Sequence, residues 1–548
     1  MDRKTPLIQG NASVNTYIVK FFRNILRWNY PLSRKEVYSF LYFFLIITSY
    51  YIIKPLRTSR FLNEIGAENI PYFYLLNSFL IFGVVYLYNL IVKAFRNKRK
   101  LLLSVNGFLV LNIFAFVFLF NFSASGGSSA WFLNSKAVST VFFIWASFFA
   151  VFVVSVFWSL MSSLYNTDEA KVSYGFIGLG GVLGGACGGS ITEFFVTRIG
   201  ESYLLFISGF LLFCCILITE KLFSIHDSSD SVEDKIVSRP ASGVGESNET
   251  STLELFRDPY VRLIAGIVLF MTMAGTIFDF QLKTLCQQDI YKEIPFQDLV
   301  NQVVDSTISP LNSSAETSKA YSEDLFKDAA VSIREDISKA ISGFRGASID
   351  RLAMDNIIDG AIGSYLSRPG FSTLAIHPSP DVVAEVRKKF TSTYTTQYFG
   401  WLFKKVSLLS LLVQAFLTAR FHQTIGVPLS LLVLPVLSMI DLSFLFLFPV
   451  LATISIATII QNGLSYSLMQ SSKEQLFIPT SDTVRYRAKS MIDTFVFRFG
   501  DAMASILILL VTRFFGYGLR ELSLVNILIV SVWIFVVFRC GKKYISRL

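Results

Sequence analysis

The chain has 548 residues, of which 53% are hydrophobic, 15% aromatic and only 16% charged. A soluble globular domain usually carries about 25% charged residues. Together with repeated long apolar runs, this composition excludes a disordered chain, a disulfide scaffold and an ordinary cytosolic enzyme. It predicts a membrane protein.

Apolar runs long enough for membrane-spanning helices recur along the chain. A span needs about 20 apolar residues, so the runs predict an all-α polytopic membrane protein of two six-helix halves, 37–220 and 261–285 with 397–540. Eleven or thirteen spans are alternatives, because one run is short and another is rich in glycine. The runs lie near 37–53, 70–92, 101–120, 138–161, 174–196, 202–220, 261–285, 398–419, 427–440, 444–469, 491–512 and 522–538.

The fifth run carries two superposed rows of glycine. Glycines four residues apart let a neighbouring helix approach closely. A phosphate-binding loop is the poorer alternative, because no strand precedes the glycines and the dinucleotide-binding spacing is not met. The rows are Gly180, Gly184 and Gly188, and Gly181, Gly185 and Gly189.

Lys and Arg gather in connections on one side of the predicted bundle, at 93–100, 473–489 and 539–547. The positive-inside rule therefore places both termini, including the tail 541–548, in the cytoplasm. Within the N-terminal segment 1–36, the stretch 15–30 mixes cations with apolar residues, as expected of a helix lying on the inner leaflet. An import presequence is the weaker alternative.

Two hydrophilic segments interrupt the spans. Residues 221–260 contain a stretch rich in Ser, Asp, Glu and Gly, which predicts a flexible cytoplasmic linker between the halves. Residues 286–396 have a net charge of −4, against +10 for the whole chain. Helical spacing after Ser322 and Ser348, and a helix start at Ser379-Pro380, predict a small helical domain inserted outside the membrane, on the non-cytoplasmic side.

Cysteine and histidine give no sign of a metal or catalytic site. The five Cys show no CxxC spacing and lie in or beside apolar runs, and the three His lie far apart without an HExxH pattern. No pairing of a nucleophile with a base is apparent. We therefore predict no enzyme activity, no cofactor, no metal and no nucleic-acid partner.

The first span ends with cations at steps of three residues, Lys54, Arg57 and Arg60, on the side where the positive-inside rule expects few. If the helix continues past Pro55, the three share one face and can bind an anion. The alternative is that they snorkel to the lipid head groups. A cation at membrane depth costs about 2.5–3.5 kcal/mol on insertion scales, which an anionic ligand would offset.

Spans seven and eleven also carry charges. Asp279 and Lys283 lie four residues apart, either as a simple ion pair within the helix or along an aqueous path. Span eleven carries a predicted polar stripe at helical spacing, unless the helix begins late and leaves Lys489 and Asp493 as an ion pair in solvent. The stripe consists of Lys489, Asp493, Arg498 and Asp501.

These motifs resemble the ATP:ADP antiporter family, the nucleotide transporters of obligate intracellular bacteria and plastids, which are related in architecture to the major facilitator superfamily. The resemblance covers essentially all spans but not 286–396, and the forms Lys-Pro-Leu-Arg and Asp-Phe-Gln-Leu-Lys are more similar to divergent bacterial members. It implies substrate-binding roles for Lys54, Arg57, Glu169, Asp279, Lys283 and Lys489. Arg60, Asp493 and Arg498 are secondary candidates because of their charge and helical spacing. The motifs run from Tyr50 to Arg57, Phe157 to Lys171, Asp279 to Lys283 and Lys473 to Asp493.

The leading hypothesis is a secondary transporter in the bacterial inner membrane that moves an anionic metabolite, most simply a nucleotide, by alternating access. One alternative is proton-coupled transport of another anionic solute, with Asp279 or Glu169 as the titrating group. Another is a membrane receptor or scaffold that has lost transport. In that case 286–396 binds an envelope protein or a second copy of the chain.

Overall fold

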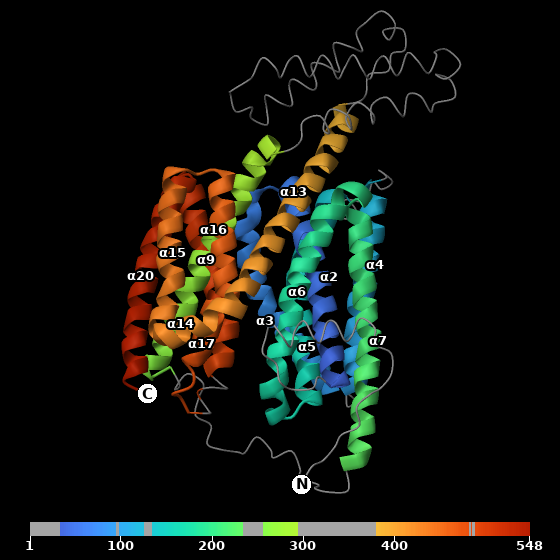
Figure 1. Ribbon diagram of the computed structural model, residues 1–548. Helices are drawn as coiled ribbons and strands as arrows, with labels where there is room; N and C mark the ends of the chain where they lie inside the picture. Colours follow the sequence, from blue (N-terminus) through green and yellow to red (C-terminus); the bar gives the residue numbers. More distant parts are fainter. Residues whose placement is uncertain are drawn as a thin grey trace, which may run out of the picture.

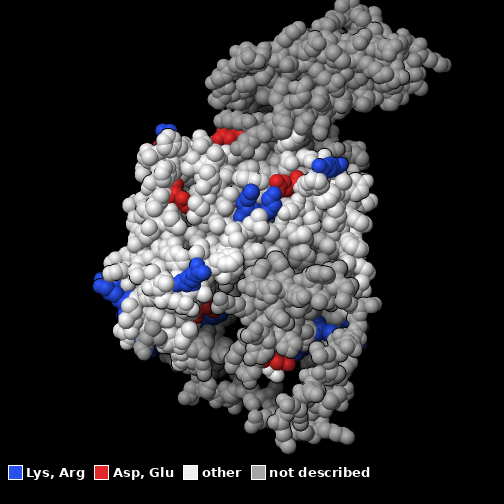
Figure 2. Space-filling view, in the orientation of Figure 1, with Lys and Arg blue, Asp and Glu red and all other residues white. Residues whose placement is uncertain are grey.

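The computed structural model describes residues 33–94, 98–124, 134–233, 256–293, 380–481, 484 and 488–547. All regular secondary structure in these ranges is helical, and ten of the helices are long and apolar enough to cross a membrane. The protein is therefore an all-α polytopic membrane protein (Figure 1). Its described surface exposes many large apolar side chains and few charges on the face shown in Figure 2, as expected of a surface in contact with lipid.

Two groups of helices make up the bundle. The N-half consists of α2 (Arg34–Glu64), α3 (Ile70–Ala94), α4 (Lys98–Ala124), α5 (Ser135–Leu164), α6 (Thr167–Ile199) and α7 (Glu201–Glu233), with a short η1 (Ala67–Asn69) after α2. Ser33 begins α2 and Asn166 begins α6, each with a capping box that satisfies free backbone N–H groups.

The C-half contains six passages, three of them broken by π-helical turns. These are α9 (Pro259–Glu293); α13 (Pro380–Leu412), η4 (Val413–Leu417) and α14 (Thr418–Thr424); α15 (Gly426–Leu447); α16 (Leu451–Leu464), η5 (Ser465–Met469) and α17 (Gln470–Gln475); α18 (Lys489–Met491), η7 (Ile492–Val496), α19 (Phe497–Leu509) and η8 (Leu510–Phe514); and α20 (Leu519–Ile545). The described helices thus make one passage for each of the twelve predicted runs.

Each half has its own hydrophobic core. At one end of the bundle, Phe61, Leu62 and Ile70 of the N-half belong to the core of the C-half. This is the end at which α9 stops and α13 begins, and we call it the insertion end (Figure 1). Helix α2 starts and helix α20 finishes at the opposite end, which we call the termini end. The two halves are therefore packed together at the insertion end.

Several predicted boundaries were wrong because charged residues continue the helices beyond the apolar runs. Helix α7 extends to Glu233, inside the predicted linker. Helix α9 extends to Glu293 and α13 starts at Pro380, so both enter the predicted 286–396 domain. The helix start at Ser379-Pro380 is confirmed. The amphipathic segment 15–30, the rest of the linker and the other predicted helices of the insertion lie outside the described residues.

The connection expected between spans nine and ten was also misplaced. Helix α15 continues through Asp441 to Leu447, and the turn comes at 448–450. Asp441 is therefore a helical residue of a membrane span and not part of a loop.

The first glycine row of α6 contacts α2, whereas the second row passes from α2 at Gly181 to α13 at Gly189. A Cβ on Gly180, Gly184 or Gly188 would lie 2.5–2.6 Å from backbone oxygens of α2, within the same half. A Cβ on Gly189 would lie 2.7 Å from Lys404 N and 2.8 Å from Gly400 O, both on α13 of the other half. The prediction of close helix packing is confirmed. Gly185 and Gly189 of the second row form part of the seam between the halves.

Candidate substrate site between the halves

A cavity of about 410 Å³ lies between the two halves, with walls from α2, α3, α5, α9, α13, α16, η5 and α19. Its charged lining residues are four cations and two carboxylates, which give it a formal charge of +2. They are Lys54, Arg57, Asp279, Lys283, Arg498 and Asp501. The sequence analysis had proposed all of them as substrate-binding residues except Asp501, which it placed only in the polar stripe.

Helix α2 brings two of these cations to the cavity one turn apart. It continues through Pro55 to Glu64, so Lys54 and Arg57 share a face. Lys54 Nζ lies 4.0 Å from the ring centroid of Phe403, and Arg57 Nη1 donates a hydrogen bond of 3.1 Å to Ser147 Oγ. Within the described residues, neither cation forms an ion pair with a carboxylate. Arg57 Nε is buried without a hydrogen-bond partner there.

Two cavity residues, Arg57 and Asn77, donate hydrogen bonds to Ser147 Oγ. The bond from Asn77 Nδ2 is 3.2 Å long, while Asn77 Oδ1 is buried without a partner in the described part of the chain. In the described part of the chain, the N-half wall therefore contains one buried donor, Arg57 Nε, and one buried acceptor, Asn77 Oδ1, without a hydrogen-bond partner. Buried polar groups are usually satisfied, so a small rearrangement of this wall around a bound group would give both atoms partners.

The other two cations are neutralised by carboxylates on their own helices. Lys283 Nζ lies 2.6 Å from Asp279 Oδ2, one turn along α9. Arg498 Nη1 lies 3.1 Å from Asp501 Oδ2, and Asp501 Oδ1 accepts a 2.7 Å hydrogen bond from Thr276. The positive charge that is free to bind an anion is therefore that of Lys54 and Arg57.

Four predicted site residues lie elsewhere. Arg60 Nε pairs with Glu201 Oε2 at 2.8 Å, and its guanidinium lies over the Phe120 ring. Glu169 caps the first turn of α6 and pairs with Lys35 at 2.9 Å. Lys489 and Asp493 do not pair with each other: Lys489 lies 2.5 Å from Glu474, and Asp493 lies 2.8 Å from Lys473. None of the four lines the cavity.

Polar contacts between α2 and α13 close the seam at the insertion end. Ser59 Oγ donates to Ser392 O at 2.5 Å, and the ion pair of Lys388 with Glu64 joins the same two helices. Ser392 Oγ also donates to Glu201 Oε1, at 2.6 Å.

Two further contacts extend this seam. Lys404 of α13 pairs with Glu193 of α6. Gln287 of α9 joins the N-half by donating to Leu62 O at 3.0 Å and accepting from Ala67 N at 2.6 Å. At the termini end, the ion pairs of Glu169, Glu474 and Asp493 given above each stay within one half. The cavity is thus shut toward the insertion end.

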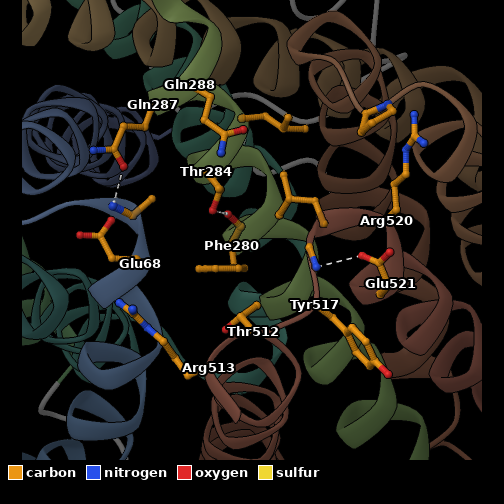
Figure 3. A pocket seen from close by; sticks show the side chains of 15 residues that line it. Glu68, Phe280, Thr284, Gln287, Gln288, Thr512, Arg513, Tyr517, Arg520 and Glu521 are labelled. Atoms are coloured by element: carbon orange, nitrogen blue, oxygen red, sulfur yellow. Dashed lines mark hydrogen bonds between the residues drawn. The ribbon is translucent and has the colours of Figure 1, made fainter. Parts of the chain in front are cut away.

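A second cavity of about 580 Å³ lies at the insertion end, between η1 and the ends of α9 and α20 (Figure 3). Its two arginines, Arg513 and Arg520, point in different directions in Figure 3, and Glu521 accepts a hydrogen bond from Gly518 N. Since the guanidinium groups diverge, they do not offer one anion a common site. The central cavity is the better candidate.

Sequence reasoning missed the neutral polar lining of the central cavity, including Tyr74, Asn77, Ser147 and Thr276. Asn77 and Ser147 lie inside apolar runs, where polar side chains usually face protein or water, so this signal could have found them. Tyr74 gives no such signal, because tyrosine is common in membrane spans.

Comparison with known proteins adds independent information. Residues 382–544 match the family model described as TLC ATP/ADP transporter. ADP,ATP carrier protein 3 of Rickettsia bellii (strain RML369-C) is 21% identical over 571 aligned positions, which cover 96% of this chain and 98% of the relative. ADP,ATP carrier protein 2 of Chlamydia pneumoniae is 32% identical over 92 residues, 16% of this chain and 17% of the relative.

Among solved structures, a variant of the nucleoside transporter NupG is similar with a TM-score of 0.49 and 10% identity, over 92% of this chain and 100% of that chain. The chain is thus similar in sequence to ADP,ATP carriers along nearly its whole length, and the family model matches its C-terminal part.

Proposed function

We propose that the protein is a secondary transporter of nucleotides that works by alternating access, with the central cavity as its substrate site. One observation carries the proposal: Lys54 and Arg57 face a cavity between the halves with no carboxylate paired to either in the described residues. Unpaired cations at membrane depth are costly. A phosphate-bearing substrate would neutralise them.

The similarity to ADP,ATP carriers supports a nucleotide as the anion. The cavity also has groups that suit the rest of such a molecule, since Tyr50, Tyr466 and Phe497 offer aromatic surface, and Gln461 and Asn462 offer amides. Orientation follows from the cation distribution: we place the termini end in the cytoplasm and the insertion end outside, in a bacterial inner membrane. The structure then corresponds to a state closed toward the outside.

Uptake into proteoliposomes tests the proposal. Radiolabelled ATP and ADP should enter vesicles loaded with unlabelled nucleotide. Lys54→Met and Arg57→Gln should each weaken binding about tenfold to a hundredfold, because a charge-assisted contact with phosphate contributes about 1.5–3 kcal/mol. Lys405→Met is the matched control, since Lys405 is an exposed cation of α13 that does not line the cavity.

The same experiment separates the alternatives. Uptake that requires counter-nucleotide indicates exchange, whereas uptake of another anionic solute driven by a pH gradient indicates proton coupling. If both variants bind and transport nucleotide normally, the cavity is not the site. If the wild type transports no phosphorylated solute, and 286–396 instead binds an envelope protein or a second copy, the protein is a receptor or scaffold.

A further inference from the structure

The hydroxyl of Tyr74 connects the two halves inside the cavity. Tyr74 belongs to α3 of the N-half. Its hydroxyl donates a hydrogen bond to Asp279 Oδ2 and accepts one from Lys283 Nζ, both on α9 of the C-half. Because Lys283 and Asp279 also pair with each other at 2.6 Å, the three side chains close a triangle across the boundary between the halves.

This triangle belongs to the cavity wall. All three residues line the cavity, and the Asp279 side chain is 44% exposed while that of Lys283 is only 5% exposed. The Lys283 ammonium, with three donors, is thus mostly covered by its two partners. An anion can reach it only by taking the place of one of them. Tyr74 is neutral, and a phosphate oxygen is the stronger acceptor.

We propose that Tyr74 is a positioning residue that ties Lys283 to the N-half in the empty carrier and is displaced from Lys283 when a phosphate group of the substrate binds. This inference rests on the proposed function for the identity of the anion. Displacement would break one of the two hydrogen bonds that the Tyr74 hydroxyl makes with α9 and leave only the bond to Asp279. Substrate binding would then weaken the closed arrangement of the halves and favour opening at the insertion end.

The position of Lys54 and Arg57 supports this order of events. The two unpaired cations of α2 attract the phosphates first, because they have no carboxylate to compete with in the described residues. Lys54 interacts electrostatically with both Asp279 and Lys283, and Arg57 interacts with Lys283. A phosphate chain held on α2 can therefore extend a second phosphate toward Lys283, at the Tyr74 contact.

The variant Tyr74→Phe removes the hydroxyl and keeps the ring. Opening at the insertion end is measured as the distance between spin labels attached to cysteines that replace Tyr203 of the N-half and Leu447 of the C-half, which are 68% and 59% exposed. The five native cysteines are first replaced. Tyr72→Phe is the matched control, because Tyr72 lies on the same helix and is 48% exposed.

We expect the empty wild type to show a short distance that lengthens when ATP is added. Empty Tyr74→Phe should already show the longer distance. Its half-saturating ATP concentration should fall two- to tenfold, because the phosphate no longer competes with the hydroxyl, while its maximal exchange rate falls. Asp279→Asn, which weakens the same triangle, should also lengthen the distance in the empty protein. Tyr72→Phe should behave as wild type in all three measurements.

Unchanged distances together with an unchanged half-saturating concentration in Tyr74→Phe would overturn the inference. The measurement on empty protein needs no substrate, so it separates this inference from the proposed function. If the wild type binds no nucleotide but empty Tyr74→Phe still opens, the contact between the halves stands and the substrate assignment falls.

Discussion

The cations that the sequence marks as candidate site residues do not all have the same role in the structure. The cations Arg57 and Lys489 were both predicted to bind substrate, yet only Arg57 lines the cavity. Lys489 joins the first turn of α18 to the end of α17 through Glu474. Charge and helical spacing predicted a substrate-binding role for both residues. Spacing along one helix, however, does not show which side chains of other helices will contact them.

This difference predicts different effects for the two residues. Arg57→Ala should weaken nucleotide binding at least tenfold, through loss of a charge-assisted contact. Lys489→Ala should change affinity less than threefold and lower the transport rate instead, because it frees the ends of α17 and α18. Equilibrium binding and initial rates measured on the same preparations separate the effects. Equal loss of affinity in both would place Lys489 in the site.

Asp258, just before α9, gives a prediction for stability and pH. Arg547 Nη2 lies 2.8 Å from Asp258 Oδ1. Burial raises the pKa of this carboxyl, but the hydrogen bonds from Arg547 and from the Tyr260 N–H, together with nearby positive charge, lower it by more, so the pKa lies below its ordinary value of 3.8. The contribution to stability is therefore present above pH 3.8 and lost as the pH falls through the lower folded value.

Asp258→Asn should accordingly lower the melting temperature slightly. A half-exposed ion pair contributes less than about 1 kcal/mol to the free energy of unfolding. The difference from wild type should be the same at about pH 7 and pH 5 and should shrink below about pH 4. Melting curves at these pH values check it. A difference that grows with acidity would mean that the pKa is raised.

At the scale of helices, the sequence predicted where the passages lie better than where they end. Apolar runs mark the hydrocarbon layer, whereas helices such as α9 continue beyond it through polar residues. The predicted loop at Asp441 was wrong for the same reason, because α15 continues through this charged residue. Lys54, Arg57, Asp279 and Lys283 could be proposed because charges inside apolar runs are rare.

The rest of the site depends on contacts between helices that no single run reveals. Ser147 orients Arg57 from α5, and Tyr74 reaches α9 from α3. A pairing of this kind joins residues 205 positions apart, as Tyr74 and Asp279 are. Residue type and local spacing contain no information on such partners.

The seam between α6 and α13 supplies a prediction at this scale. A Cβ added at Gly189 would lie 2.7 Å from Lys404 N and 2.8 Å from Gly400 O, both backbone atoms that cannot turn aside. Gly189→Ala should force the helices apart at a cost of about 1–3 kcal/mol and open the insertion end. Gly178→Ala on the same helix meets nothing within 4 Å and should be neutral or stabilising.

Melting temperature and the spin-label distance across the insertion end measure both variants. A longer distance and a lower melting temperature are expected for Gly189→Ala alone. If Gly189→Ala matches Gly178→Ala in both, the close approach of α6 and α13 is not what holds the seam.

For the whole molecule, topology follows from the arrangement of the passages. Helices α2 and α20 begin and end at the termini end, while α9 stops and α13 starts at the insertion end (Figure 1). Combined with the cation distribution, this predicts that Ser242 faces the cytoplasm and Ser348 the outside. Cysteines introduced at these two positions should differ in intact cells: an impermeant reagent should label the one at 348 alone. Labelling of only the one at 242 would reverse the orientation.

The last prediction concerns residues 294–379, which separate α9 from α13. Every contact described above that closes the insertion end is made by residues outside this range, including Gln287 with Leu62 and Lys388 with Glu64. The segment has a net charge of −4, which repels an anionic solute from the cavity mouth rather than attracting it. Replacing 294–379 by a Gly/Ser linker of about 20 residues should therefore leave nucleotide binding unchanged, because flexible connections of this length are tolerated.

Binding to the purified deletion variant tests this prediction, with the spin-label distance as a check that the insertion end still closes. A variant that inserts and closes normally but binds no nucleotide would show that the segment contributes to the site. If binding and exchange in proteoliposomes survive while activity in cells is lost, the segment acts through a partner. Its net charge of −4 would then favour a basic envelope protein over a second copy of the same segment, since like charges repel.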